Sequence, residues 1–314
     1  MENKPKIAVL DDYQQVAFAM ADWTAIKQEA DVTVFTDHIA EEDKIIERLK
    51  PFDAICVMRE RTPLTRSILS QLPNLKLIVS TGTRNASIDT KAVEELGIML
   101  KHTGYISTGA SELTWALLMA FARHIPQEVN NFKAGGWQQT VGIDLSGKTI
   151  GIIGLGRLGE KMAHYAKAFD MKVIAWSQNL TVEKAEAAGA KLVSKEELFK
   201  QADIVTMHLV LSDRSSGIVG KAEFDLMKPT AYFINTSRGP LVDEQALIET
   251  LQQKKIADAA IDVFDVEPLP ADHPLRKLDN LLATSHIGYV TENTYRLFYG
   301  DTVAILNEWC KAQI

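Results

Sequence analysis

Short apolar runs rich in β-branched residues alternate with helical patterns along most of this chain. Four runs lie in the first hundred residues, at 6–10, 31–35, 53–58 and 75–80. Six more follow, at 148–154, 172–176, 203–209, 231–235, 257–262 and 280–285. Runs of this length between helical patterns are typical of parallel βαβ units. We therefore expect an α/β fold that contains two doubly wound sheets.

The length of 314 residues gives room for two domains, each with its own core. We place the boundary between the two domains near Gly104, so that the first domain comprises 1–103 and the second comprises 104–288. A long helical pattern at 110–132 follows the boundary, and the last helical pattern, within 289–314, is expected to pack back onto the first domain.

Helix capping signals support this assignment at two places. Asp89 and Thr90 are both candidates for the N-cap of a helix that stops at Gly97. Ser194 and Glu197 have the spacing of a capping box.

Composition excludes several classes of protein. Lys and Arg total 34 against 41 Asp and Glu, a net charge of −7 without a basic stripe, so we expect no nucleic-acid partner. The N-terminal apolar run is too short for a signal segment or a membrane span, which favours a cytoplasmic protein. Cys56 and Cys310 are too few for a disulfide framework or a metal site, and we expect Cys56 in the core.

The segment GLGRLG places Gly154, Gly156 and Gly159 in G-x-G-x-x-G spacing between a strand and a helix. Gly154 permits a tight turn, Gly156 leaves space for a pyrophosphate, and Gly159 allows close packing of helix and strand. Arg157 and Leu158 follow in the same turn, which would present the N-terminus of the next helix to the pyrophosphate. The inward face of the helix is expected at Leu158, Met162, Tyr165 and Phe169.

The following strand ends where an acid commonly reads the adenosine ribose and favours NAD over NADP. Ser177, Gln178 and Asn179 stand there instead, and no arginine lies in this loop to pair with a 2′-phosphate. The residues therefore leave both NAD and NADP open, and they predict relaxed selectivity between the two cofactors.

Three polar residues each follow a predicted strand of the second domain: Arg238, Glu267 and His286. Ligands of open α/β sheets bind outside the carboxyl ends of the strands, so these side chains are expected to converge. Arg238 could pair with a substrate carboxylate, and protonated His286 could donate a proton to a carbonyl oxygen. Glu267 could hold the other imidazole nitrogen and favour the charged ring.

The motifs GLGRLG, NTSRGPLVDE, DVFDVEP and SHIG, in this order, resemble the D-isomer-specific 2-hydroxyacid dehydrogenase family over nearly the whole chain. The resemblance implies a Rossmann-type NAD(P)-binding domain inserted in a flavodoxin-like substrate domain made of 1–103 and 289–314. It implies that Arg238, Glu267 and His286 are catalytic. It also implies that cofactor is contacted by Thr108, Thr236, Asp262 and Gly288 in addition to the glycine turn and 177–179.

The same resemblance places the substrate loop at 80–89, where the amides of Gly82 and Thr83 would bind a carboxylate. Met58, Arg59 and Glu60 are our candidates for the wall that faces the substrate side chain. The resemblance also suggests a homodimer with Trp137 near its interface, although an ordinary buried tryptophan is an equal alternative.

The expected reaction is reduction of a small 2-oxo acid, such as glyoxylate or hydroxypyruvate, to the D-2-hydroxy acid. Some positions depart from the family pattern: TGTRN replaces the commoner Gly-x-Gly-x-Asp-Asn, and the proline usual after His208 is missing. Two alternatives stay open, a dinucleotide-sensing interaction protein of the same fold and a phosphite dehydrogenase. Glu267 argues against formate as substrate, because the related formate dehydrogenases carry glutamine there.

Overall fold

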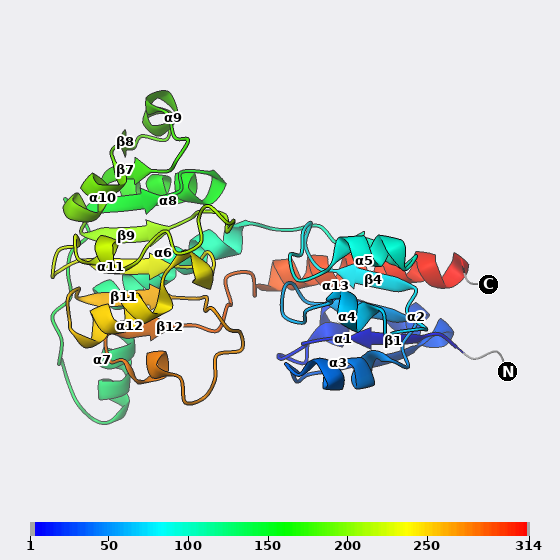
Figure 1. Cartoon of the computed structure of the whole chain (residues 1–314). Coiled ribbons are helices and arrows are strands. Elements are labelled where there is room, and N and C mark those ends of the chain that lie inside the picture. The colour runs from blue at the N-terminus through cyan, green and yellow to red at the C-terminus, as the bar shows by residue number, and fades with distance from the viewer. Residues whose placement is uncertain (1–3, 313–314) are drawn as a thin grey trace. The chain divides into compact units, whose positions relative to one another are not determined.

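The computed structural model describes residues 4–312 and divides into two compact units. The first unit comprises Met1–Ile106 and Val290–Ile314, and the second comprises Ser107–Tyr289. The second unit is therefore inserted in the chain between the two parts of the first (Figure 1).

The first unit is built on a parallel sheet of five strands in the order β2-β1-β3-β4-β5. The strands are β1 (Lys6–Val9), β2 (Asp31–Val34), β3 (Ala54–Val57), β4 (Leu77–Ser80) and β5 (Met99–His102). The helices are α1 (Ala17–Met20), α2 (Thr24–Glu29), α3 (Glu42–Leu49), α4 (Arg66–Leu69), α5 (Thr90–Glu95) and α13 (Glu292–Ala312). The C-terminal helix α13 packs on α1 and α2, as expected (Figure 1).

Strands β3 and β4 are buried along their whole length because helices cover both faces of this sheet. One face packs on α3, α4 and α5 through residues such as Ile55 and Ile78. Cys56 is buried in β3, which confirms its predicted place in the core.

The second unit contains a parallel sheet of seven strands in the order β12-β11-β10-β9-β6-β7-β8. The strands are β6 (Thr149–Ile153), β7 (Lys172–Trp176), β8 (Lys191–Leu192), β9 (Ile204–Met207), β10 (Tyr232–Asn235), β11 (Asp258–Ile261) and β12 (Leu281–Ala283). The order reverses between β6 and β9, as in the Rossmann arrangement. Two doubly wound sheets, one flavodoxin-like and one Rossmann-type, confirm the predicted fold class.

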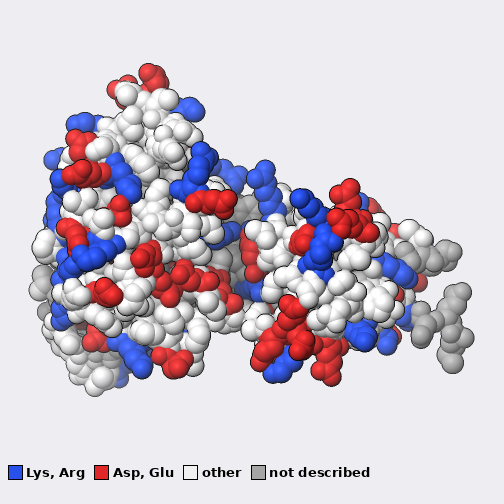
Figure 2. Space-filling model, in the orientation of Figure 1, with Lys and Arg blue, Asp and Glu red and all other residues white. Residues whose placement is uncertain are grey.

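Helices cover both faces of the second sheet (Figure 1). They are α6 (Thr108–Ala122), α7 (Ile125–Lys133), α8 (Arg157–Ala168), α9 (Val182–Ala187), α10 (Lys195–Gln201), α11 (Lys221–Phe224) and α12 (Glu244–Gln252), with 3-10 turns η1 (Gly239–Leu241) and η2 (Pro274–Lys277). Among the described residues, no helix is both long and apolar enough to cross a membrane. Figure 2 shows acidic and basic side chains interspersed on the visible face of each unit.

Two expected helix caps can be compared with the structure. Asp89, not Thr90, is the N-cap of α5, because its carboxylate accepts from the Ala92 amide at 2.9 Å. The predicted capping box of Ser194 and Glu197 is confirmed at α10.

The long helical pattern at 110–132 is two helices. Helix α6 ends at Ala122, His124 adopts a left-handed conformation with φ of 48°, and α7 begins at Ile125. Pro126 explains the break, because proline lacks an N–H and fits only the first turn of a helix.

The inward face of α8 agrees with the expectation at Met162, which is buried, and differs from it at Phe169. The fully buried residues are Gly159, Met162, Ala163 and Ala166. Phe169 remains 39% exposed and contacts Trp115 of α6, with ring centroids 4.9 Å apart and the ring planes tilted by 55°. The fully buried residues form the contact because the helix lies close to the sheet at Gly159, where a Cβ would be only 2.2 Å from the Gly154 carbonyl oxygen.

Candidate active site

The glycine turn connects β6 to α8, and each glycine meets a different local constraint. Gly154 has φ of +98°, and a Cβ there would lie 2.7 Å from the backbone of His208. A Cβ on Gly159 would lie 2.2 Å from the Gly154 carbonyl oxygen. At Gly156, the N-cap of α8, a Cβ would meet no protein atom within 4 Å. The turn thus leaves open space at one glycine, in front of a helix N-terminus, where a pyrophosphate would fit.

His208 follows β9 and adjoins this turn. Its Nε2 and the Thr206 hydroxyl are hydrogen-bonded at 2.9 Å. Burial lowers the pKa of His208 to about 4, so the ring is neutral at pH 7. This histidine therefore adds no positive charge to the glycine turn, and anion binding there depends on backbone amides and the helix end.

The end of β7 lies beside the glycine turn, because the Gly154 amide donates to the Trp176 carbonyl at 2.9 Å. Ser177, Gln178 and Asn179 follow, and within residues 4–312 their side chains make no hydrogen bond. The ammonium of Lys195 lies 5.9 Å from the Trp176 ring centroid, but it is paired with Glu223 at 2.7 Å. The end of β7 thus offers uncharged polar groups, and the charge of the nearby Lys195 is neutralised by Glu223.

Arg238 follows β10 in a turn held by side-chain hydrogen bonds. The Asn235 amide donates to the Arg238 carbonyl at 2.9 Å, and its oxygen accepts from the Ser237 amide at 3.1 Å. The Arg238 guanidinium donates to the Ser237 carbonyl at 2.7 Å. Gly239 closes the turn against Phe264, since a Cβ there would lie 2.1 Å from a backbone atom of that residue.

Glu267 and His286 follow β11 and β12, and their side chains meet. The imidazole Nδ1 lies 2.6 Å from Glu267 Oε2, while Oε1 accepts from the Phe264 amide at 3.0 Å. Exposure of 24% for the His286 side chain and 33% for Glu267 keeps the pair accessible. Within residues 4–312, Nε2 of His286 makes no hydrogen bond. The ring is therefore oriented at one nitrogen and available at the other, as a general acid requires.

Asp262 anchors the turn that carries His286. Its Oδ1 accepts from the Thr284 hydroxyl at 2.6 Å and from the Ile287 amide at 2.8 Å. Its Oδ2 accepts from the Gly288 amide at 2.8 Å. Burial raises the pKa of Asp262, although these donors act against that shift. These contacts hold His286 in a left-handed conformation with φ of 53°, which is costly without such support.

The other two expected cofactor residues lie at the same edge of the sheet. The Thr236 hydroxyl is hydrogen-bonded to the Thr114 hydroxyl at 2.7 Å, which joins the end of β10 to α6. Thr108 is the exposed first residue of α6. Gly288 is close to this helix, since a Cβ there would lie 3.5 Å from Ala110.

In the first unit, the expected substrate residues follow β3 and β4. The Gly82 amide donates to the Thr103 hydroxyl at 2.8 Å, so it is not available to a carboxylate in this structure. The Thr83 amide makes no hydrogen bond within residues 4–312. Met58 is 2% exposed, with its sulfur 3.6 Å from the Thr81 hydroxyl, so it belongs to the core and not to a substrate wall.

Arg59 lies over the Gly82 loop. Its Nη1 donates to the carbonyls of Thr81 and Arg84 at 3.1 and 3.2 Å, and its Nη2 lies 3.2 Å from Glu60. A Cβ on Gly82 would be only 2.0 Å from Nη1, so the glycine makes room for the guanidinium.

Sequence reasoning did not find the supporting role of Asn235 or that of Asp262. An asparagine two residues before a serine, directly at a strand end, is the signature of an Asx turn and could have predicted the first. Nothing local in the sequence signals the second, because the hydrogen-bond donors to Asp262 lie more than twenty residues further along the chain.

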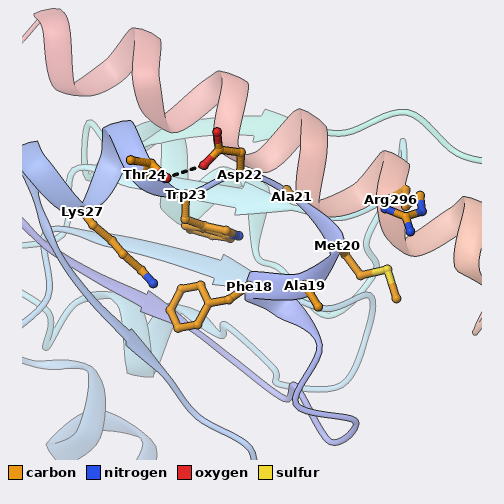
Figure 3. Close-up of a pocket in the computed structure, with 9 residues that line it drawn as sticks. All are labelled: Phe18, Ala19, Met20, Ala21, Asp22, Trp23, Thr24, Lys27 and Arg296. Atoms are coloured by element: carbon orange, nitrogen blue, oxygen red, sulfur yellow. Dashed lines mark hydrogen bonds between the residues drawn. The ribbon is translucent and has the colours of Figure 1, made fainter.

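A hollow of about 460 Å³ lies elsewhere in the first unit, between the 18–24 segment and α13 (Figure 3). The Lys27 ammonium lies 3.6 Å from the Phe18 ring centroid, and Asp22 accepts from the Thr24 amide at 2.9 Å. None of the predicted site residues lines this hollow.

A Rossmann-type sheet with an open glycine turn and a His–Glu pair at adjacent strand ends defines a dinucleotide-binding α/β protein. Comparison with known proteins gives the family. The model of the D-isomer specific 2-hydroxyacid dehydrogenase, NAD binding domain, matches residues 115–288. The chain belongs to the D-isomer specific 2-hydroxyacid dehydrogenase family, as its motifs predicted.

Two relatives and one solved structure illustrate the similarity. The D-3-phosphoglycerate dehydrogenase of Methanocaldococcus jannaschii is 38% identical over 93% of this chain and 55% of its own length. The glyoxylate reductase of Aeropyrum pernix is 36% identical over 72% of this chain and 71% of its own length. A crystal structure of phosphoglycerate oxidoreductase from Vibrio cholerae has a TM-score of 0.92 at 39% identity, covering 98% of this chain and 99% of that one.

The coverage differs among the curated relatives. The chain spans 55% of the D-3-phosphoglycerate dehydrogenase of Methanocaldococcus jannaschii and 48% of that of Archaeoglobus fulgidus, or about half of the length of each.

The different surroundings of Gly156 and Gly159 generate a prediction. Gly159→Ala should lower the free energy of unfolding by about 1–3 kcal/mol, because its methyl group would collide with the Gly154 carbonyl. Gly156→Ala should lower it less, by about 1 kcal/mol or less, because open space surrounds the new methyl group and only the preference of an N-cap for glycine over alanine is lost. It should nevertheless weaken NADH binding at least tenfold. Urea unfolding and NADH fluorescence titration measure the two effects, and equal destabilisation by both variants would contradict this assignment.

Proposed function

We propose that this protein reduces a small 2-oxo acid to the D-2-hydroxy acid with NADH or NADPH. The observation that carries the proposal is the His286–Glu267 pair, 2.6 Å apart, with the second imidazole nitrogen available. Arg238 follows the neighbouring strand β10, so one sheet edge provides an acid and a cation. The family supports an oxidoreductase of 2-hydroxy acids that uses NAD.

The residues of the second unit fit a nicotinamide dinucleotide. The open space at Gly156 and the N-terminus of α8 suit a pyrophosphate. When bound, the reduced cofactor supplies a hydride to the substrate carbonyl carbon. This leaves the chain with three tasks: binding the carboxylate, stabilising negative charge on the carbonyl oxygen, and protonating that oxygen.

The chain's own groups can carry out these tasks. Arg238 pairs with the substrate carboxylate and stabilises the developing charge on the carbonyl oxygen. His286 donates a proton from Nε2, while Glu267 accepts from Nδ1 and fixes the ring orientation. Asp262 positions this histidine through its turn and also belongs, as the family resemblance implies, to the nicotinamide site. We assign the Thr83 amide and Arg59 of the first unit to substrate binding, and the glycine turn of the second unit to cofactor binding.

A panel assay tests the proposed function. Glyoxylate, hydroxypyruvate and pyruvate should be compared with 3-phosphohydroxypyruvate, because the relatives include both glyoxylate reductases and D-3-phosphoglycerate dehydrogenases. Each acid should be tested with NADH and with NADPH. Cofactor binding without turnover of any acid would favour a dinucleotide sensor, and NAD reduction by phosphite would favour a phosphite dehydrogenase.

His286→Asn should lower kcat on the best acid by about 10²–10⁴, because the general acid is lost. The dissociation constant for NADH should stay within about twofold, since the pyrophosphate site is untouched. His273→Asn is the matched control, because His273 also pairs with a glutamate, Glu244, at 3.2 Å in the same unit but outside the candidate site. Retention of kcat in His286→Asn would remove this residue from the mechanism.

The uncharged end of β7 predicts weak cofactor selectivity. Wild type should use NADH and NADPH with kcat/KM values within about a hundredfold of each other, because each tenfold needs only about 1.4 kcal/mol. Ser177→Asp should favour NADH by repelling the 2′-phosphate, and Ser177→Arg should favour NADPH by pairing with it. The measurement is kcat/KM with both cofactors at one salt concentration.

Thr181→Asp provides the control for added charge. It keeps an N-cap acceptor for the Lys184 amide and places the same charge four residues further along. If Thr181→Asp changes the ratio of kcat/KM for NADH to that for NADPH as much as Ser177→Asp does, the effect of Ser177→Asp is long-range electrostatics and not a contact with the ribose.

We also propose that the protein is a homodimer formed through α7 and the segment after it. Ile125, Val129 and Phe132 share one face of α7 and are 49%, 43% and 67% exposed. Trp137 and Val141 are 76% and 91% exposed, so Trp137 is not an ordinary buried tryptophan of the described chain. Exposed apolar groups gathered on one segment are typical of a protein interface.

Phe132→Asp should convert the dimer to a monomer at micromolar concentration, because a charge would be buried in an apolar interface. Val182→Asp, at a 51% exposed apolar residue of α9, is the matched control and should remain dimeric. Sedimentation velocity measures the mass. A monomeric wild type, or a dimeric Phe132→Asp, would contradict the proposed interface.

A further inference from the structure

The first unit carries a buried polar cluster at the point where its strand order reverses. In the order β2-β1-β3-β4-β5, β2 lies on one side of β1, and β3, the next strand in the chain, lies on the other side. Ligands of doubly wound sheets bind outside the carboxyl ends of the strands at such a point. Here Asp11 follows β1, and the turn 58–63, which follows β3, lies beside it.

Asp11 holds that turn with both its side chain and its backbone. Its Oδ2 accepts from the Thr62 hydroxyl at 2.6 Å, and its carbonyl oxygen accepts from Arg61 Nη1 at 2.7 Å. Its Oδ1 lies 3.0 Å from His38 Nδ1. Asp11 is only 1% exposed, so its carboxylate depends on these partners in place of water.

Two residues of this region adopt a conformation that L side chains rarely take. Asp11 has φ of 58° and Arg59 has φ of 51°. Such residues persist only where the surroundings fix them, and they are common at ligand-binding sites. The two residues follow the adjacent strands β1 and β3, and hydrogen bonds from Arg61 and Thr62 to Asp11 join the turns after these strands.

The turn is also held from the side of β4. The Arg59 amide donates to the Thr81 hydroxyl at 2.8 Å, and the Arg59 carbonyl accepts from Asn85 at 2.6 Å. The guanidinium of Arg59 in turn lies over Gly82, next to Thr83. The turn 58–63 is therefore held on one side by the contact between Asp11 and Thr62, and on the other by contacts to Arg59, the residue that we assign to substrate.

We propose that Asp11 is a positioning residue that, through Thr62 and Arg61, holds Arg59 in the conformation that binds the 2-oxo acid. The inference rests on the proposed function, because it assigns Arg59 to substrate. Asp11 itself is buried and reaches Arg59 only through the turn. Its loss should therefore weaken substrate binding and leave both the hydride-transfer groups and the cofactor site of the second unit unchanged.

Two variants remove the contact in different ways. Thr62→Val keeps the shape of the side chain but removes the donor to Asp11. Asp11→Gly removes the carboxylate while allowing the positive φ. Both should raise KM for the best acid about tenfold or more, with kcat and the KM for cofactor within about twofold. The dissociation constant of oxamate, a non-reducible analogue, should rise in parallel when measured by calorimetry with cofactor present.

Two further variants separate positioning from folding. Thr62→Ser keeps the hydroxyl and should restore KM to within about twofold of wild type. Asp12→Gly removes the adjacent buried carboxylate, which caps α1 through the amides of Val16 and Ala17. It should lower the melting temperature without changing KM.

The outcomes distinguish the inference from the function on which it rests. If wild type reduces a 2-oxo acid but Thr62→Val and Asp11→Gly lower only the melting temperature, Asp11 is structural and the inference is overturned. The same conclusion follows if Asp12→Gly raises KM as much as Asp11→Gly does. If wild type reduces none of the acids, the proposed function fails, and the inference fails with it.

Discussion

A parallel strand that is covered by helices on both faces can carry polar chemistry only at its ends. Strands β3, β4, β9 and β10 are buried at every residue, so none of their side chains can meet a ligand. The turns after the strands are the first positions free of this constraint. All the candidate site residues outside α6 lie in such turns or at the N-terminus of α8, which directly follows one of these turns.

The turns share a hydrogen-bonding pattern that explains how charged residues are held there. An aspartate or asparagine at or just after a strand end accepts or donates several hydrogen bonds within an adjacent turn. Asn235 holds the turn of Arg238, Asp262 holds that of His286, and Asp11 holds the turn that contains Arg59. In each case the anchor is nearly buried, at 1–2% exposure, while the group that it supports is more accessible. Burial strengthens the anchoring bonds, and exposure leaves the supported group available.

Much of this arrangement is predictable from the sequence because it depends on local patterns. The alternation of apolar runs and helical patterns predicts both sheets, and the glycine spacing predicts the β6–α8 turn. The polar residues after the strands predict that Glu267 and His286, two candidate catalytic groups, lie together. The supporting contacts are harder to predict, because the donor and acceptor are far apart in the chain: Asp11 and Thr62 are separated by 51 positions, and Asp262 and Gly288 by 26.

The errors of sequence reasoning have physical causes of the same kind. The face of α8 departs from the expected pattern at Phe169, because Gly159 brings the helix so close to the sheet that Met162, Ala163 and Ala166 fill the contact. The Gly82 amide points to Thr103, a residue of the adjacent strand end, and no pattern in the loop itself indicates that partner. Met58 follows a buried strand and was expected to face substrate, yet it continues the core by one residue.

The strained residues show how stability and function are balanced at these turns. Asp11, Arg59 and His286 all have positive φ, and each such residue costs on the order of 1–3 kcal/mol. A net gain of about 1.5–3 kcal/mol from a hydrogen bond to a charged group is enough to offset one of these costs. Asp11 and Asp262 each accept at least two such bonds with their carboxylates, which accounts for the persistence of the strain. The support reaches the two candidate site residues in different ways: Asp262 binds the amides that follow His286, whereas the backbone of Arg59 is held directly by the uncharged side chains of Thr81 and Asn85.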